Sequence, residues 1–138
     1  MGSRRKGREF ALQALYLADI SDMPEQRAFR SLVRGGGLDE KGKEFAEALA
    51  AGALREIRQL DEMIVKYAQN WEMKRMAALD RNLLRLGAYE ILFELDTPVS
   101  VIIDEAVEIA KTFSTPDSGK FVNGILDRIK NERKPKKD

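Results

Sequence analysis

The sequence predicts an all-α protein of about seven helices. Along most of the chain, apolar residues recur at the three- and four-residue spacing of one helix face. No stretch alternates apolar and polar residues between turn signals, as a half-buried strand would. The composition agrees, because a chain of 138 residues that is 43% hydrophobic and 34% charged, with only 10 Gly and 4 Pro, suits one packed helical domain.

Turn signals separate the first two predicted helices. The first helix runs from about Arg5 to Asp19 and is apolar nearly all round, so we expect it to lie deep in the core. Ser21 or Asp22 is a candidate cap for the second helix, with Pro24 in its first turn. The glycines at 35–37 end that helix.

Two apolar stripes follow without a clear boundary between them. Asp39 is a candidate cap for the third helix, whose stripe begins at Phe45. A fourth stripe runs from Ile57 to Trp71. The pattern does not place the break between the two helices within residues 54–60.

The last three helices have clearer limits. A central helix is expected over residues 76–95, because its apolar positions cover more than half of the circumference. Thr97 is a candidate cap and Pro98 a first-turn residue for the next helix. A corner at residues 114–117 precedes the final helix, which ends near Ile129.

The formal charge of +1 hides a strong asymmetry. Residues 1–8 form a basic arm with four bases and no acid, and the tail from Arg128 onward has six bases and two acids. The rest of the chain holds 14 bases and 21 acids. Contact with a polyanion is therefore expected to be local and to begin at a terminus.

The basic arm opposes the helix that it begins. A helix N-terminus carries a partial positive charge and favours Asp or Glu, by about 0.3–1 kcal/mol each. Bases at this place are better explained by an external anion, and Arg suits phosphate through its forked donors. The alternative is that the arm serves only solubility. The C-terminal bases agree with the helix dipole and are interpreted as a solvated tail.

Residue types missing from the chain exclude much of enzyme chemistry. There is no Cys and no His, which removes disulfides, thiolate metal sites, cysteine nucleophiles and the commonest general base. The acidic group Asp104, Glu105 and Glu108 is interpreted as the outer face of a surface helix. No catalytic residue, metal site or cofactor is predicted. No apolar stretch is long enough for a membrane span, so a cytoplasmic protein is expected.

Single-stranded RNA is usually bound by stacking on aromatic residues as well as by phosphate contacts. Aromatic and polar residues near the basic arm or near the corner before the final helix could hold such a strand. Core packing is the expected role of Phe10 and Phe113, whereas Tyr16 could be a partly exposed contact residue. The segment 117–124, which follows this corner, contains a Gly-Lys pair but lacks the spacing of a phosphate-binding loop. Close helix packing is the expected reason for Gly124.

Four stretches of the chain carry a recognisable pattern, namely Arg4 to Tyr16, Asp80 to Glu90, Pro98 to Lys111 and Asp117 to Gly124. Together they resemble the bacterial NusB family of transcription antitermination factors. They lie at both ends and in the centre of the chain, in the family's order and spacing, whereas residues 20–75 match only in helical pattern.

The resemblance implies a fold and a function. The family has two orthogonally packed helical bundles in one compact domain, here residues 5–131, which would follow the basic arm 1–8 and precede a basic disordered tail, 132–138. Its members bind boxA RNA of ribosomal RNA operons together with NusE, a small-subunit ribosomal protein, and help the elongation complex pass terminators. Some members pair through the surface that would otherwise meet RNA, so a homodimer stays open.

The resemblance also assigns residues by matching positions. Those implied to face RNA are Arg4, Arg5, Lys6, Arg8, Gln13, Asp117, Ser118, Lys120 and Asn123. Those implied to lie near NusE are Tyr16, Lys74, Asp80 and Arg81. Lys74 departs from relatives that carry an acid there. Two alternatives remain, namely a helical adaptor that binds only protein and a detached accessory domain of a ribosomal RNA methyltransferase.

Overall fold

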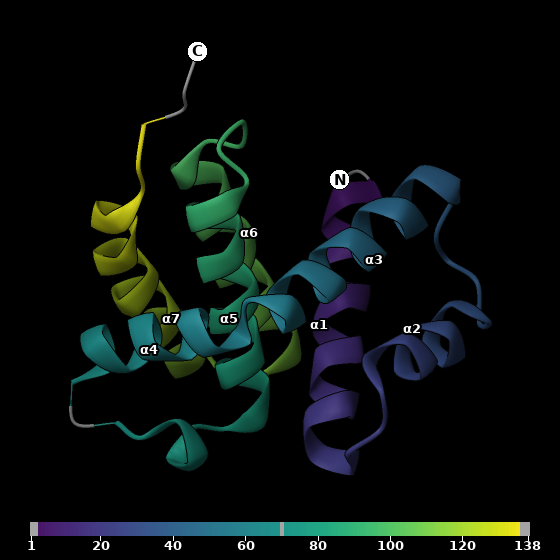
Figure 1. Cartoon of the computed structure of the whole chain (residues 1–138), viewed down its shortest axis with the longest axis horizontal. Helices are drawn as coiled ribbons and strands as arrows, with labels where there is room; N and C mark the ends of the chain where they lie inside the picture. Colours follow the sequence, from purple (N-terminus) through teal and green to yellow (C-terminus); the bar gives the residue numbers. More distant parts are fainter. Residues whose placement is uncertain (1–2, 70, 136–138) are drawn as a thin grey trace. The chain divides into compact units, whose positions relative to one another are not determined.

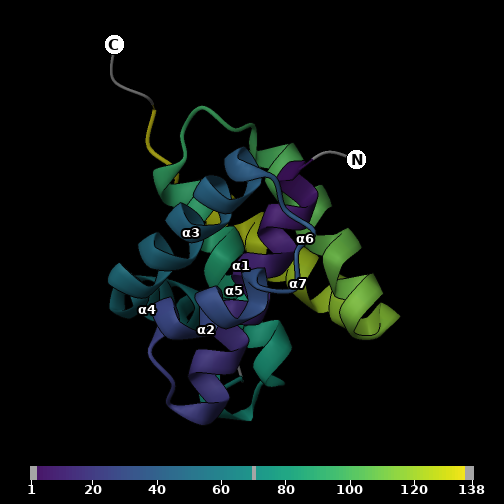
Figure 2. The ribbon, with the colours of Figure 1, turned by 90° about the vertical axis from the view of Figure 1, so that its right-hand side faces the viewer.

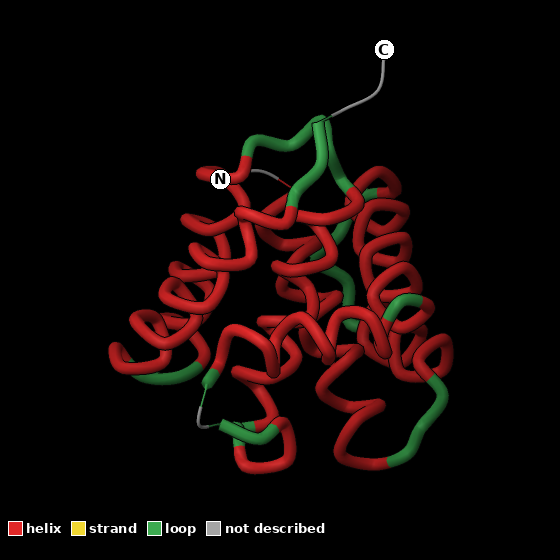
Figure 3. The backbone as a smooth tube through the Cα atoms, turned by 60° about the vertical axis from the view of Figure 1, so that its left-hand side comes forward, coloured by secondary structure: helices red, strands yellow, loops and turns green. Residues whose placement is uncertain are grey.

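The computed structural model describes residues 3–69 and 71–135, and this part of the chain contains helices and no strand (Figures 1 and 3). The all-α prediction and the helix count are therefore confirmed. The α-helices are α1 (Ser3–Ser21), α2 (Glu25–Val33), α3 (Glu40–Arg55), α4 (Ile57–Ala68), α5 (Ala78–Phe93), α6 (Val99–Phe113) and α7 (Pro116–Ile129). Two short 3₁₀ helices are η1 (Met73–Arg75) and η2 (Lys130–Glu132).

The chain divides into two compact units. Unit 1 covers residues 1–55 and unit 2 covers residues 56–138. The boundary coincides with the helix break that the apolar pattern did not place. Glu56, with φ −100° and ψ 17°, interrupts the helical backbone between α3 and α4.

Unit 1 is a three-helix assembly in which α1 packs against both α2 and α3 (Figure 2). Its core contains Ala14, Phe29 and Ala46, and Phe10 packs against this cluster as the sequence predicts. Gly7 lets α1 approach α3 closely, because a Cβ atom there would lie 2.8 Å from Cδ2 of Phe45. This contact places the first turns of α1 beside an aromatic ring.

The predicted helix caps of unit 1 have different outcomes. Asp39 caps α3 as predicted, since the backbone N–H of Gly42 donates to its Oδ1 at 2.7 Å. The predicted cap of α2 is wrong. Because α2 begins at Glu25, its cap position is Pro24, which makes no side-chain capping bond. Asp22 instead has a φ of 56°, in the left-handed region, directly after the end of α1.

Unit 2 is built around α5, which contacts α4, α6, α7 and η2. Every residue from Asn82 to Ile91 is buried, which agrees with the apolar pattern predicted for a central helix. Gly87 permits close packing of α7, because a Cβ atom there would lie 2.7 Å from Cδ1 of Leu126. Thr97 is not the cap of α6, because the helix begins at Val99 and the cap position is again a proline, Pro98.

A guanidinium clamp fixes the segment after α7 to unit 2. Arg133 donates to the carbonyl oxygens of Ile91 at 2.7 Å, Glu94 at 2.7 Å and Glu90 at 3.3 Å. These carbonyls lie at the C-terminal end of α5, where a cation also suits the helix dipole. Arg133 thus connects the segment after α7 to the end of α5.

Arg133→Ala is expected to lower the free energy of unfolding by about 1–3 kcal/mol, because it removes a charged donor from helix-terminal carbonyls. Lys134→Ala is the matched control, since Lys134 is exposed and its loss should change stability by less than about 0.5 kcal/mol. Urea unfolding followed by circular dichroism measures both. Equal midpoints for the two variants would contradict a stabilising clamp.

Candidate nucleic-acid interface

In unit 1, residues 4–8 of the basic arm lie in the first turns of α1, and Phe45 of α3 packs against two of them. The guanidinium carbon of Arg4 lies 4.6 Å from the centroid of the Phe45 ring, and that of Arg8 lies 5.3 Å from it. A guanidinium within about 6 Å of an aromatic face is attracted to it. The ring therefore holds two of the four bases in place although the helix terminus opposes them.

The predicted RNA-facing residues of α1 differ in exposure. Arg4 and Lys6 are exposed, Arg5 and Gln13 are half-buried, and Arg8 is only 5% exposed. The first turn contains no acid. Arg4 and Lys6 are consequently the bases of the arm most accessible to a phosphate, and Arg8 has a larger part in packing than the sequence suggests.

In unit 2 the corner before α7 is held by hydroxyl groups. The backbone N–H of Ser118 donates to Oγ1 of Thr115 at 3.2 Å, which makes Thr115 the helix cap. The hydroxyl of Ser118 lies 2.7 Å from that of Ser114 and donates to Oδ2 of Asp80 at 3.1 Å. Ser118 is buried, so its position suits holding Asp80 and not meeting RNA directly.

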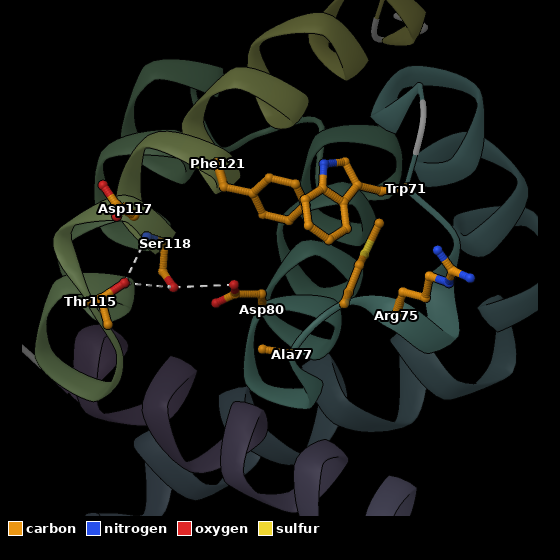
Figure 4. Close-up of a pocket in the computed structure, with 9 residues that line it drawn as sticks. Trp71, Arg75, Ala77, Asp80, Thr115, Asp117, Ser118 and Phe121 are labelled. Atoms are coloured by element: carbon orange, nitrogen blue, oxygen red, sulfur yellow. Dashed lines mark hydrogen bonds between the residues drawn. The ribbon is translucent and has the colours of Figure 1, made fainter.

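These contacts line a pocket of about 410 Å³ in unit 2 (Figure 4). Trp71 and Phe121 form one side, with ring centroids 5.7 Å apart in an edge arrangement at 70°. Trp71 is 49% exposed. The other lining residues are Arg75, Met76, Ala77, Asp80, Thr115, Asp117 and Ser118. An accessible aromatic pair next to polar groups can accept a flat ring that carries hydrogen-bond donors.

Asp80 is the polar group of this pocket that is least satisfied. It is 9% exposed, and its Oδ1 has no hydrogen-bond partner among the described residues. Burial raises the pKa of Asp80, while the bond from Ser118 acts in the opposite direction. Figure 4 shows the Arg75 guanidinium directed away from Asp80, so it leaves the carboxylate without a nearby cation from that side.

The other residues expected near NusE are not among the residues that line this pocket. Arg81 donates to the carbonyl oxygens of Met73 at 3.0 Å and Met76 at 3.1 Å, which fixes η1 to α5. Lys74 is exposed and lies 3.8 Å from the carboxylate of Glu72. Tyr16, in unit 1, is half-buried.

Three exposed positions of α7 complete the corner. Asp117, Lys120 and Asn123 all face solvent, as their predicted role requires. Phe113, expected in the core, is 39% exposed at the end of α6. The close packing predicted for Gly124 is wrong, because a Cβ atom there would meet no described atom within 4 Å.

Sequence reasoning missed that Trp71 lines the pocket and that Phe45 lies beside the bases of the arm. Trp71 extends the apolar stripe of α4 in the sequence, but α4 ends at Ala68 and Trp71 lies beyond it. A tryptophan followed by the charged stretch 72–75 was the signal that could have found it. For Phe45 no local signal existed, because its contact with the arm joins residues about forty positions apart.

Among the described residues, no group of acids is arranged to hold a metal ion. Within the same residues, no helix is long and apolar enough to cross a membrane.

Comparison with known proteins decides the family. The model of the NusB family matches residues 5–131. The chain belongs to the NusB family. A transcription antitermination protein NusB from Elusimicrobium minutum is 47% identical, with 97% of each chain covered. The corresponding protein from Symbiobacterium thermophilum is 46% identical, over 92% of this chain and 88% of its own. The family acts in transcription antitermination and is not a family of enzymes.

Solved NusB structures have the same fold. The structure of T. maritima NusB gives a TM-score of 0.88 at 41% identity and covers 96% of this chain and 93% of its own. A crystal structure of antitermination factors NusB and NusE in complex with dsRNA gives a TM-score of 0.87 at 27% identity, over 94% and 97% of the two chains.

The buried carboxylate predicts a pH dependence of stability. Because the pKa of Asp80 in the folded protein is raised above its ordinary value of 3.8, the folded state holds this proton more tightly than the unfolded state does. Protonated Asp80 therefore contributes to stability below its ordinary pKa of 3.8, and this contribution is lost as the pH rises through the raised pKa of the folded state. Asp80→Asn should therefore raise the Tm at pH 7 by about 2–4 °C and change it less near pH 4.

Thermal unfolding at both pH values measures this difference. The pKa of Glu25 is raised in the same direction by burial and by Glu47, so some pH dependence should remain in the variant. Glu25→Gln in unit 1 is the matched control, because Glu25 is a buried acid that does not line the pocket. An Asp80→Asn protein with a lower Tm than the parent at pH 7 would contradict the assignment.

Proposed function

We propose that this chain is an RNA-binding transcription antitermination factor that binds boxA RNA of ribosomal RNA operons together with NusE and promotes processive transcription. The observation that carries the proposal is the unpaired, buried Oδ1 of Asp80 beside the rings of Trp71 and Phe121. A buried acceptor without a partner costs about 1–3 kcal/mol and calls for a ligand that donates to it.

A nucleobase from single-stranded RNA fits this pocket. Its flat face can stack on Phe121 or Trp71, and stacking holds single-stranded RNA in many proteins. Cytosine and adenine carry an exocyclic amino group, and guanine carries an amino and an imino group, that can donate to Asp80. Uracil presents one N–H group between two carbonyl oxygens, and the Asp80 carboxylate would repel these two oxygens. The pocket is thus proposed to read an amino-bearing base.

The basic arm supplies the attraction for the RNA backbone. Arg4 and Lys6 are exposed cations on α1, and Phe45 fixes the Arg4 guanidinium before any ligand arrives. A side chain that is already ordered loses less entropy on binding. In this proposal the RNA phosphates contact Arg4, Arg5 and Lys6. The arm is supported by Arg8 and Gln13. Further contacts to RNA come from three residues of α7, namely Asp117, Lys120 and Asn123.

The comparison with NusB and NusE bound to dsRNA supports both partners, since it covers nearly the whole chain. The contact with NusE is proposed to include Tyr16, Lys74 and Arg81. For Asp80, burial in the pocket favours an RNA base over NusE. The protein would act on the cytoplasmic elongation complex, and self-association through the RNA surface would compete with RNA.

Affinity for boxA-like RNA is expected to depend strongly on salt. If about four to six phosphates are neutralised, the slope of log affinity against log salt should be roughly −3 to −4 for a single strand. Replacing Arg4, Arg5, Lys6 and Arg8 by Ala should make the slope shallower by about 0.7 for each phosphate that is no longer neutralised. Fluorescence anisotropy at several salt concentrations measures it. Unchanged binding by the Ala variant would favour the adaptor that binds only protein.

Phe121→Ala is expected to weaken RNA binding by about 1–3 kcal/mol because a stacking surface is removed, without a change in salt slope. Phe93→Ala is the matched control, because Phe93 is also a partly exposed aromatic residue of unit 2 and lies outside this pocket. Anisotropy with boxA-like and scrambled RNA, with and without NusE, reads both variants. If both weaken binding equally, loss of stability and not stacking explains the effect.

A further inference from the structure

Three arginines occupy the outer face of α2, a feature that the proposed function does not use. Arg27, Arg30 and Arg34 follow one another at spacings of three and four residues, which places them within about 60° of one another around the helix axis. All three are exposed, whereas the opposite side of the helix is buried through Ala28 and Phe29. These three residues form the arginine stripe of α2, which ends at the C-cap residue Arg34.

No acid pairs with the arginine stripe within the described part of the chain. None of its three side chains makes a hydrogen bond or an ion pair to another described residue. Like charges one turn apart on a helix destabilise that helix. The helix dipole favours Arg30 and Arg34 near the C-terminus, but it disfavours Arg27, which is the third residue of α2. The free chain therefore gives no reason for three arginines on this face.

The composition of this face indicates the kind of ligand. Gln26 and Ser31, the exposed residues beside the arginines, are polar, and none of the exposed large apolar side chains of the described chain lies in α2. A protein interface generally has apolar or aromatic residues at its centre. Contacts to a nucleic-acid backbone need only cations with hydroxyl or amide groups, and a guanidinium binds phosphate through two parallel donors. The stripe therefore suits phosphates better than a protein surface.

The C-terminal end of the arginine stripe lies near the basic arm, within unit 1. Gly37 follows Arg34 by three residues, and a Cβ atom at Gly37 would lie 3.6 Å from Cζ of Phe10. Val33, the last residue of α2, packs against the same core cluster as Phe10. Phe10 lies about one turn after Lys6 on α1. One strand can consequently contact both the arm and the stripe without leaving unit 1.

We infer that RNA flanking the boxA segment lies along α2, with its phosphates bound by Arg27, Arg30 and Arg34. This inference rests on the proposed function and adds to it a second phosphate-binding surface, which holds the flanking strand whatever its sequence. Because phosphate contacts carry no base information, the added affinity should depend on the length of the RNA and on salt, and not on the flanking bases.

The test compares two RNAs that share one boxA-like segment, of which the longer also carries uridine flanks on both sides. Uridine is chosen because the proposed pocket disfavours uracil, so the flanks add mainly backbone. The parent protein should bind the longer RNA about fivefold or more tightly, with a salt slope steeper by about 0.7 for each further phosphate that is neutralised. Combining Arg27→Gln, Arg30→Gln and Arg34→Gln should remove most of both gains and leave binding of the short RNA unchanged. Fluorescence anisotropy in the presence of NusE measures both RNAs.

A charge-matched control removes three exposed bases of unit 2, by Arg58→Gln, Lys130→Gln and Lys134→Gln, and should leave the length gain intact. Replacing the three stripe arginines by Lys should retain most of the gain, because the positive charge is kept although the forked donor geometry is lost.

The inference fails if the longer RNA binds the parent no more tightly than the short one, or if the Gln variant of the stripe keeps the gain. It also fails if the control loses the gain equally. None of these results affects the proposed function, which the short RNA and the Ala variant of the arm test separately. Loss of NusE binding by the Gln variant, with the length gain intact, would assign the stripe to an acidic protein segment and would overturn the inference as well.

Discussion

The burial of α5 is the constraint on which the architecture of unit 2 depends. A helix whose apolar positions cover more than half of its circumference is stable only if other helices cover it, and α4, α6 and α7 do so. That cover brings the start of α7 to the start of α5. Asp80 in the first turn of α5 and Ser118 in the first turn of α7 therefore meet, although 38 positions separate them.

The same arrangement creates the pocket. The segment after α4 must return to the start of α5, and Arg81 fixes η1 on this path through the carbonyls of Met73 and Met76. Trp71 is thereby held outside a helix, against Phe121 of α7. An aromatic pair and a buried carboxylate thus come from three separate parts of the chain, positioned by helix packing and by one arginine.

The sequence predicts the helices well because their signal is repeated in every turn. The central helix, expected over 76–95 and found at Ala78–Phe93, shows this, since many apolar positions contribute and no single one decides. A helix cap depends on one residue, so an error of one or two positions in the predicted start of the helix assigns the wrong cap. Asp22 and Thr97 failed for that reason, because in each case proline occupies the position directly before the helix.

The candidate site was predicted less completely, because its contacts join distant parts of the chain. Charge and the family resemblance identified the arm and the corner, and Arg4, Lys6 and Lys120 are exposed as such a role requires. Composition could not distinguish Arg8, which is buried, from Arg4, because both belong to one basic run. The support of Arg4 by Phe45 also required the packing of α1 on α3.

Two features that lower the stability of the free protein belong to residues proposed to bind RNA. The arm places bases at a positive helix end in unit 1, and Asp80 keeps a buried oxygen unpaired in unit 2. Each is unfavourable in the chain alone, and the proposed RNA would bring phosphates to the arm and a hydrogen-bond donor to the carboxylate. Local conflicts of this kind are expected where binding, and not folding, determines the residue.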